Sequence, residues 1–154
     1  MTSSSTAAPT SLEAAMRRPT VREGQHLIHA SRHPRGCLPT AVNARLVKAM
    51  LAEDWIYRED MDGYRLEADE ALGYRGGTPW RITDRGRWTA LTVRQRRLLG
   101  ELAESRPTPA RRDARATALV EAQLAEEVGE TLRLTTLGRR LVRDSTQRRE
   151  ADQP

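Results

Sequence analysis

The chain has 154 residues, of which 26 are basic and 21 acidic, and a single cysteine. This length allows one domain or two small ones. No apolar run approaches the roughly 18 residues of a transmembrane helix, and Cys37 has no second cysteine to pair with. The composition therefore excludes an integral membrane protein and a disulfide-stabilised scaffold. One thiol and the lack of a secretory signal lead us to expect a cytoplasmic protein.

Both ends of the chain are predicted to be disordered tails. Residues 1–19 are rich in Ser, Thr and Ala, and residues 145–154 are polar. A short helix is predicted inside the first tail, at 11–18, because a threonine precedes it and a proline stops it. Between the tails we expect two folded modules, at 20–90 and 91–144.

The first module is predicted to begin with two helices. Thr20 and Glu23 match a capping box, which opens a helix over residues 20–33. Thr40 is expected to cap a second helix that runs to about Asp54. Four apolar residues share one face of this second helix: Leu46, Val47, Met50 and Leu51.

A β-hairpin is predicted after these helices. Residues 55–57 favour a strand, Asp62 and Gly63 form a turn, and residues 64–66 return as the second strand. All six aromatic residues lie between positions 55 and 88. We expect them to pack this hairpin region, and the alternative is a stacking platform for single-stranded nucleic acid.

The second module is predicted to repeat this order. Thr92 and Gln95 form another capping box, which opens a helix that buries three leucines. A long helix at 108–127, a strand at 132–135 and a short helix at 137–143 are expected to follow.

Two segments repeat along the chain. Residues 46–54 match residues 119–127 at six of nine positions, with an offset of 73. Residues 80–87 read Trp-Arg-Ile-Thr-Asp-Arg-Gly-Arg, and residues 132–139 read Leu-Arg-Leu-Thr-Thr-Leu-Gly-Arg. These matches indicate a duplicated unit of helix followed by hairpin.

This order, with a second strand of the pattern apolar-Arg-apolar-Thr-x-x-Gly-Arg, resembles the winged helix-turn-helix family of DNA-binding repressors. In the second module the resemblance is carried by residues 119–128 and 132–140. It implies an α+β, mostly helical fold of two winged-helix-like modules, and a transcriptional regulator that binds double-stranded DNA. The first module departs from the family because a loop replaces the middle of three helices.

The predicted DNA contacts lie on the long helices and beside the second hairpin. The outward face of the first module's long helix carries Arg45 and Lys48, with Thr40 at its start; the alternative is an ordinary solvated face. Arginines of the second module would contribute further phosphate contacts. The full set is Thr40, Arg45, Lys48, Arg111, Arg112, Arg115, Arg133, Arg139 and Arg140.

The alternative function is a protein-interaction or dimerisation module built on the same scaffold. The predicted outward face of the second module's long helix is rich in alanine, which favours close helix packing and a homodimer. That face comprises Arg111, Ala114, Ala118, Glu121 and Ala125.

Charge is segregated along the sequence. Residues 53–72 hold eight acids and two arginines, residues 81–115 ten arginines and four acids, and residues 131–149 six arginines and one acid. A polyanion would contact the two basic stretches if they share a surface. The alternative is that the acidic stretch packs against them and neutralises them.

Neither a metal site nor catalysis is expected. His26, His29 and His33 have helical spacing and Cys37 follows, which are residue types that bind zinc. Pro34 interrupts the helix between them, so we expect surface histidines and no metal. The sequence also lacks a nucleophile elbow and a zinc-protease motif, so we expect neither an enzyme nor a cofactor.

Overall fold

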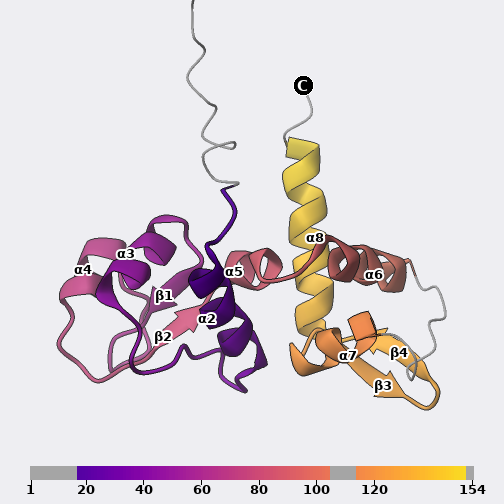
Figure 1. Cartoon of the computed structure of the whole chain (residues 1–154), viewed down its shortest axis with the longest axis horizontal. Coiled ribbons are helices and arrows are strands. Elements are labelled where there is room, and N and C mark those ends of the chain that lie inside the picture. Colours follow the sequence, from indigo (N-terminus) through magenta and orange to yellow (C-terminus); the bar gives the residue numbers. More distant parts are fainter. Residues whose placement is uncertain (1–16, 105–113, 152–154) are drawn as a thin grey trace, which may run out of the picture.

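The structure is a computed structural model that describes residues 17–104 and 114–151, and it is an α+β protein with mostly helical elements. Its elements form two modules that follow one another along the chain (Figure 1). The first module consists of α2 (Val21–Arg32), α3 (Ala44–Ala52), β1 (Ile56–Arg58), α4 (Ala68–Gly73), β2 (Trp80–Ile82) and α5 (Asp84–Thr89). The second consists of α6 (Val93–Ala103), α7 (Ala114–Glu121), β3 (Ala125–Val128), β4 (Thr131–Leu134) and α8 (Thr136–Ala151).

Each module has its own hydrophobic core. In the first, α2, α3 and the β1–β2 hairpin pack around Trp55, which is 1% exposed. In the second, α6, α7, the β3–β4 hairpin and α8 bury Leu98, Leu99 and Leu119 completely. The chain passes from one core to the other between α5 and α6, where Leu91 already belongs to the second core.

Helices α2 and α6 begin with the predicted capping boxes. Thr20 Oγ1 accepts a hydrogen bond from Glu23 N (3.2 Å), and Glu23 Oε1 accepts one from Thr20 N (2.9 Å). Thr92 and Gln95 make the same reciprocal pair, at 3.2 and 2.9 Å. Each box satisfies two backbone groups at a helix end that would otherwise lack partners, which fixes the first residue of the helix.

In each module a threonine hydroxyl that follows the second strand bonds to the turn after the helix that precedes the first strand. These helices are α3 in the first module and α7 in the second. Thr83 Oγ1 donates to Asp54 O (2.6 Å), and Thr135 Oγ1 donates to Gln123 O (2.7 Å). Asp54 and Gln123 both have a left-handed backbone, with φ of 58° and 63°, which turns the chain out of the helix. The two modules therefore share one junction geometry.

This geometry corrects the alignment expected from the sequence. The structure pairs Asp54 with Gln123, an offset of 69, whereas the sequence match paired Asp54 with Glu127. The difference is four residues, about one helical turn, and a shift of one turn leaves the same apolar face inward. The sequence match alone could not distinguish the two alignments.

A glycine completes each junction. Gly86 N donates to Thr83 Oγ1 (2.9 Å), and Gly138 N donates to Thr135 Oγ1 (3.1 Å). A Cβ atom on Gly86 would lie 2.2 Å from Trp55 O, and one on Gly138 would lie 2.1 Å from Leu124 O. Since backbone atoms cannot yield as a flexible side chain can, the helix approaches the strand this closely only with glycine.

The first hairpin differs from the predicted one. Strand β1 pairs with β2, with Ile56 opposite Ile82, and the predicted return strand at 64–66 makes only an isolated bridge between Glu59 and Arg65. Residues 59–79, including α4, are therefore an insertion between the two strands. The strand predicted at 55–57 corresponds to β1, but its partner is β2, which lies farther along the chain than the predicted return strand.

Arg58 holds this insertion in place. Its guanidinium donates to Thr78 O (3.0 Å), Tyr74 O (2.9 Å) and Gly76 O (2.6 Å). The same group lies 5.2 Å from the ring centre of Tyr74 and 5.5 Å from that of Trp80. One cation therefore satisfies several loop carbonyls and gives the insertion a fixed conformation.

Several predicted helix boundaries are wrong. Asn43, not Thr40, caps α3, because its side chain accepts from the backbone of the second helical residue. Helix α7 ends at Glu121, and the segment expected to continue it forms β3. Helix α8 extends to Ala151, so residues 145–151 are helical and not a disordered tail. The helix predicted at 11–18 lies outside the described residues, except for two that are not helical.

Arg17 ties the segment before α2 to the first module. Its guanidinium forms two hydrogen bonds to the carboxylate of Glu23 (2.8 and 2.9 Å) and one to Glu53 (3.1 Å). It also lies 4.7 Å from the ring centre of Trp55. Glu23 is 1% exposed, and these bonds from Arg17 and from Thr20 lower its pKa to about 2.

The buried Glu23 carboxylate should make stability depend on acid pH. Its pKa is lower in the folded state than the ordinary value of 4.5, so its contribution is present above that value and is lost as the pH falls toward 2. We expect the free energy of unfolding to fall by about 2 kcal/mol more in the wild type than in Glu23→Gln between pH 6 and pH 2.5. Glu67→Gln, at an exposed position without an ion pair, serves as the control and should keep the wild-type dependence. Equal pH profiles for the wild type and Glu23→Gln, measured by urea unfolding, would contradict this assignment.

The close approach at Gly138 predicts a large effect of a single methyl group. Gly138→Ala should lower the free energy of unfolding by roughly 2–4 kcal/mol, because the added Cβ overlaps the Leu124 carbonyl. Gly100→Ala, in α6 of the same module, meets no atom within 4 Å and should be neutral or stabilising by up to about 1 kcal/mol. Thermal and denaturant unfolding of both variants test this, and equal stabilities would show that the junction tolerates a side chain.

Candidate nucleic-acid interface

Helix α3 presents the predicted cationic face. Its apolar side buries Val47 and Met50, and its opposite side exposes Arg45 and Lys48. Within the described part of the chain, neither of these two cations has an ion-pair or hydrogen-bond partner for its side chain. Thr40 is also exposed, in a turn that precedes the helix. Arg45 and Lys48 therefore share the outward side of α3, and Thr40 is exposed in the preceding turn.

The segment between α2 and α3 contains no helix. Residues 33–43 are all described, and they form turns and a short extended stretch. Cys37 forms a bridge with Arg81, and Leu38 N donates to Trp80 O (2.9 Å), so this stretch adds a third strand-like segment beside β2. The predicted departure from a three-helix arrangement is confirmed for the first module.

Arg133 lies on a hairpin that is more acidic than expected. It is exposed on β4, directly opposite the exposed Glu126 of β3. Glu127 and Glu130 are also exposed on this hairpin. Side chains opposite one another on two strands are neighbours on one face, so a phosphate near Arg133 would also meet carboxylates.

Arg139 and Arg140 have different roles although they are adjacent on α8. Arg139 is exposed and unpaired within the described residues. Arg140 binds both carboxylate oxygens of Asp84, at 2.6 and 2.8 Å, and this pairing raises the Arg140 pKa. Because Asp84 begins α5, this pair links the two modules (Figure 1).

The remaining predicted contacts fall near the start of α7. Arg115 is half-buried on α7. Arg111 and Arg112 lie outside the described residues. Ala114 is exposed and Ala118 is half-buried, but Ala125 is 3% exposed in β3. The predicted alanine face is therefore wrong at this end, because the helix stops before Ala125.

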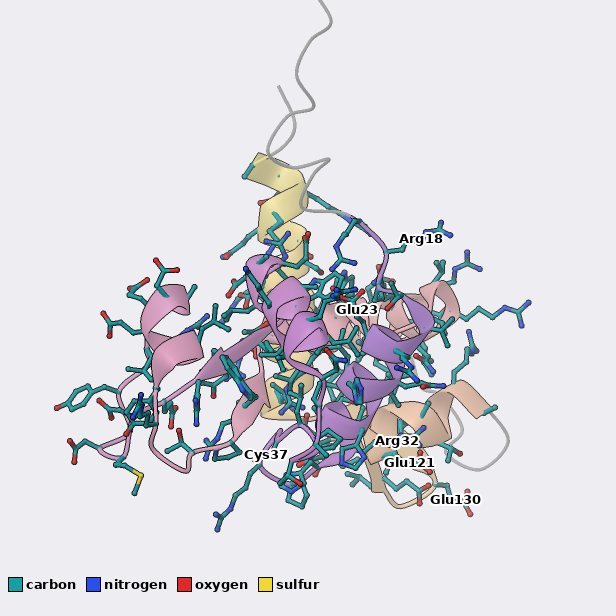
Figure 2. The ribbon with its side chains drawn as sticks, turned by 60° about the vertical axis from the view of Figure 1, so that its left-hand side comes forward. Arg18, Glu23, Arg32, Cys37, Glu121 and Glu130 are labelled. Carbon is teal, nitrogen blue, oxygen red and sulfur yellow. The ribbon has the colours of Figure 1, made fainter. Side chains whose placement is uncertain are left out.

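The predicted contacts that the structure describes do not form one continuous surface. Figure 1 shows α2 and α5 between α3 and the second module, so the α3 cations are separated from those of β4 and α8. The modules also meet at the end of α2, where Gln123 Nε2 donates to His33 O (2.9 Å). Beside this contact, Arg32 and Glu121 form an ion pair at 3.0 Å, and Figure 2 shows these two side chains next to one another.

The acidic stretch neutralises the basic stretches only slightly. Among its residues, Asp54 pairs with Arg65 of the same stretch (2.8 Å), and Glu53 pairs with Arg17. Glu59 also faces Arg81 of the first basic stretch, at 3.9 Å. Most of the negative charge of residues 53–72 thus remains on the surface of the inserted segment.

The aromatic residues act mainly in packing. Trp55 is buried, and Trp80 and Trp88 are half-buried, each with an arginine beside its ring. Tyr64 is the exception, with 73% of its surface exposed. Because the tryptophans are covered by protein, they do not offer an open platform on which successive bases could stack.

The histidines and the cysteine do not converge. His33 Nδ1 accepts hydrogen bonds from the backbone N–H groups of Arg35 and Cys37, and Cys37 is 9% exposed. In residues 17–104 and 114–151, no group of three or more His, Cys, Asp or Glu side chains is arranged to hold a metal ion. These ranges likewise contain no helix with the length and apolarity needed to cross a bilayer.

Comparison with known proteins gives no match. No family model, no curated protein and no solved structure is significantly similar to this chain. The functional argument therefore depends on the residues and on the geometry described above.

Proposed function

We propose that the protein binds double-stranded DNA through α3 and acts as a transcriptional regulator. The observation that carries the proposal is the exposed, unpaired pair Arg45 and Lys48 on the outward side of a short amphipathic helix. Such a helix fits the major groove, and its cations would neutralise phosphates or contact base edges. Thr40, in the preceding turn, would add a hydroxyl contact.

The order of elements supports the same proposal. Two helices followed by a two-stranded hairpin and a further helix occur in both modules, with the same threonine and glycine at the junction. This is the arrangement that the resemblance to winged helix-turn-helix proteins implies, although the first module lacks the middle helix. The resemblance concerns scaffold, and the DNA contact itself is argued from α3.

The inserted segment restricts how a duplex could approach. Helix α4 packs beside α3, and the exposed Glu67, Asp69 and Glu70 lie at its start. These carboxylates would repel DNA phosphates. A duplex on α3 would therefore be attracted by Arg45 and Lys48 and repelled where it approaches α4.

A salt-dependent titration tests the proposal. In fluorescence anisotropy with a labelled duplex at low salt, the wild type should bind, and Arg45→Ala/Lys48→Ala should bind at least about tenfold more weakly. The slope of log affinity against log salt should become shallower by about 1–2, because two phosphate contacts are lost.

A matched double variant controls for the change in net charge. Arg94→Ala/Arg97→Ala removes two exposed, unpaired arginines from α6 and should bind nearly as tightly as the wild type. Equal losses in the two double variants would indicate nonspecific attraction to a basic protein. Absence of duplex binding by the wild type at low salt would overturn the proposal.

The inserted segment favours a second candidate function, docking of another protein. Met61 and Tyr64 are each 73% exposed at the tip of the insertion, among carboxylates. Exposed apolar side chains ringed by polar ones are typical of interaction sites. A second copy of the chain is the simplest partner to examine, since its basic surface complements this acidic tip.

Self-association through the tip is tested by sedimentation velocity. If the chain dimerises through these side chains, Met61→Ser/Tyr64→Ser should shift the concentration-dependent species to the monomer mass. Val21→Ser/Val93→Ser removes two other exposed apolar side chains and should leave the distribution unchanged. A wild-type chain that remains monomeric up to about 100 µM would exclude a homodimer with a typical micromolar affinity.

A further inference from the structure

An arginine-rich pocket lies where the two modules meet. It has a volume of about 470 Å³ and is bounded by the outer side of the first hairpin, the turn around Gly63, the start of α5 and one side of α8. Tyr57 lines one side of the pocket, and the guanidinium of Arg65 lies over its ring, 4.9 Å from the ring centre. Six of the lining residues are arginines: Arg35, Arg65, Arg85, Arg87, Arg140 and Arg148.

The acids of the pocket do not balance these cations. Asp54 is paired with Arg65, and Asp84 is paired with Arg140. The third acid, Glu59, faces Arg81 at 3.9 Å. The lining thus holds more arginines than carboxylates, and Arg35, Arg87 and Arg148 form no ion pair within the described residues.

Arg87 is the most informative of these cations because it is half-buried in the last turn of α5. Its guanidinium makes one long hydrogen bond, to Ser31 O at 3.5 Å, although the group can donate five. Burial lowers its pKa, the neighbouring Asp84 carboxylate opposes this shift, and the charge of Arg140 adds to it. The guanidinium of Arg87 therefore has donors left for an anion that enters the pocket, and charge-assisted hydrogen bonds from them would favour that anion.

We propose that this pocket is a binding site for a phosphate-bearing anion, held by Arg87 from the first module and Arg148 from the second. The volume lies within the usual range for small-molecule sites, roughly 300–1,000 Å³, and admits a group the size of a di- or triphosphate. Planar guanidinium groups bind phosphate oxygens with directional, charge-assisted hydrogen bonds. The phosphate belongs either to a free small molecule or to the backbone of bound DNA.

The position of the pocket gives the anion a structural consequence. Arg35 and Arg87 belong to the first module, whereas Arg140 and Arg148 lie on α8 of the second. A bound phosphate would therefore bridge the modules beside the Asp84–Arg140 pair. Ligands that bind the folded state raise its stability, so binding of the anion can be measured as a rise in Tm.

Pyrophosphate is the probe for the test. At constant ionic strength set with sodium chloride, pyrophosphate should raise the Tm of the wild type and give a saturable calorimetric titration. Arg148→Gln should weaken binding at least about tenfold, and Arg87→Gln should weaken it by a similar or larger factor. Arg97→Gln, an exposed arginine on α6, should bind pyrophosphate like the wild type.

Arg148→Gln keeps the test interpretable if Arg87→Gln unfolds, because Arg148 is exposed near the end of α8. The proposal is overturned if pyrophosphate has no effect beyond that of chloride, or if Arg148→Gln and Arg97→Gln bind it equally.

The source of the phosphate is decided by the duplex titration with Arg148→Gln. Lost pyrophosphate binding with unchanged duplex affinity identifies a site for a free phosphate compound. Loss of both identifies a backbone-phosphate contact of the DNA interface. The pocket depends on neither Arg45 nor Lys48, so its failure would leave the proposed function of α3 standing, and the reverse also holds.

Discussion

The fold depends on one repeated junction, at which a threonine hydroxyl bonds to the turn that follows α3 or α7 and to a glycine in the first turn of α5 or α8. Thr83 and Thr135 each link three parts of their module through a single oxygen atom. The glycine allows the following helix to lie against the carbonyl of the residue just before the first strand. This contact fixes the angle between the hairpin and α5 or α8. It therefore also determines which side chains pack together in each core. The pattern Thr-x-x-Gly is thus explained by local backbone geometry.

The helix that follows this shared junction differs between the two modules. In the first, α5 is short and its first residue, Asp84, reaches across to α8. In the second, α8 continues to Ala151 and so presents arginines to both modules along its length. The first hairpin also carries the insertion that Arg58 organises through loop carbonyls. The two modules therefore share one junction geometry, and the elements in which they differ form the surface between them.

Local signals predicted the parts of the fold that local chemistry determines. Capping boxes placed the starts of α2 and α6, and apolar spacing identified Val47, Met50 and Leu119 as inward residues. The pairing of β1 with β2 was not predictable in the same way, because its partner lies beyond an insertion that also contains a β-prone segment. The end of α7 was missed because residues 119–125 copy a helical sequence from the other module, while a left-handed Gln123 stops the helix earlier.

The candidate binding residues also divide into those that the local sequence predicts and those that only the packing of distant segments brings together. The exposure of Arg45 and Lys48 follows from helical periodicity, and the sequence predicted it correctly. The pocket joins Arg35, Arg87 and Arg148, which lie 52 and 61 residues apart, so only the packing of the two modules brings them together. A net charge of +5 conceals this arrangement, because the acids are concentrated on the insertion beside α3 and the unpaired arginines on the junction. If a polyanion binds, repulsion by the insertion and attraction by the junction and by Arg45 and Lys48 would together restrict its orientation on the protein.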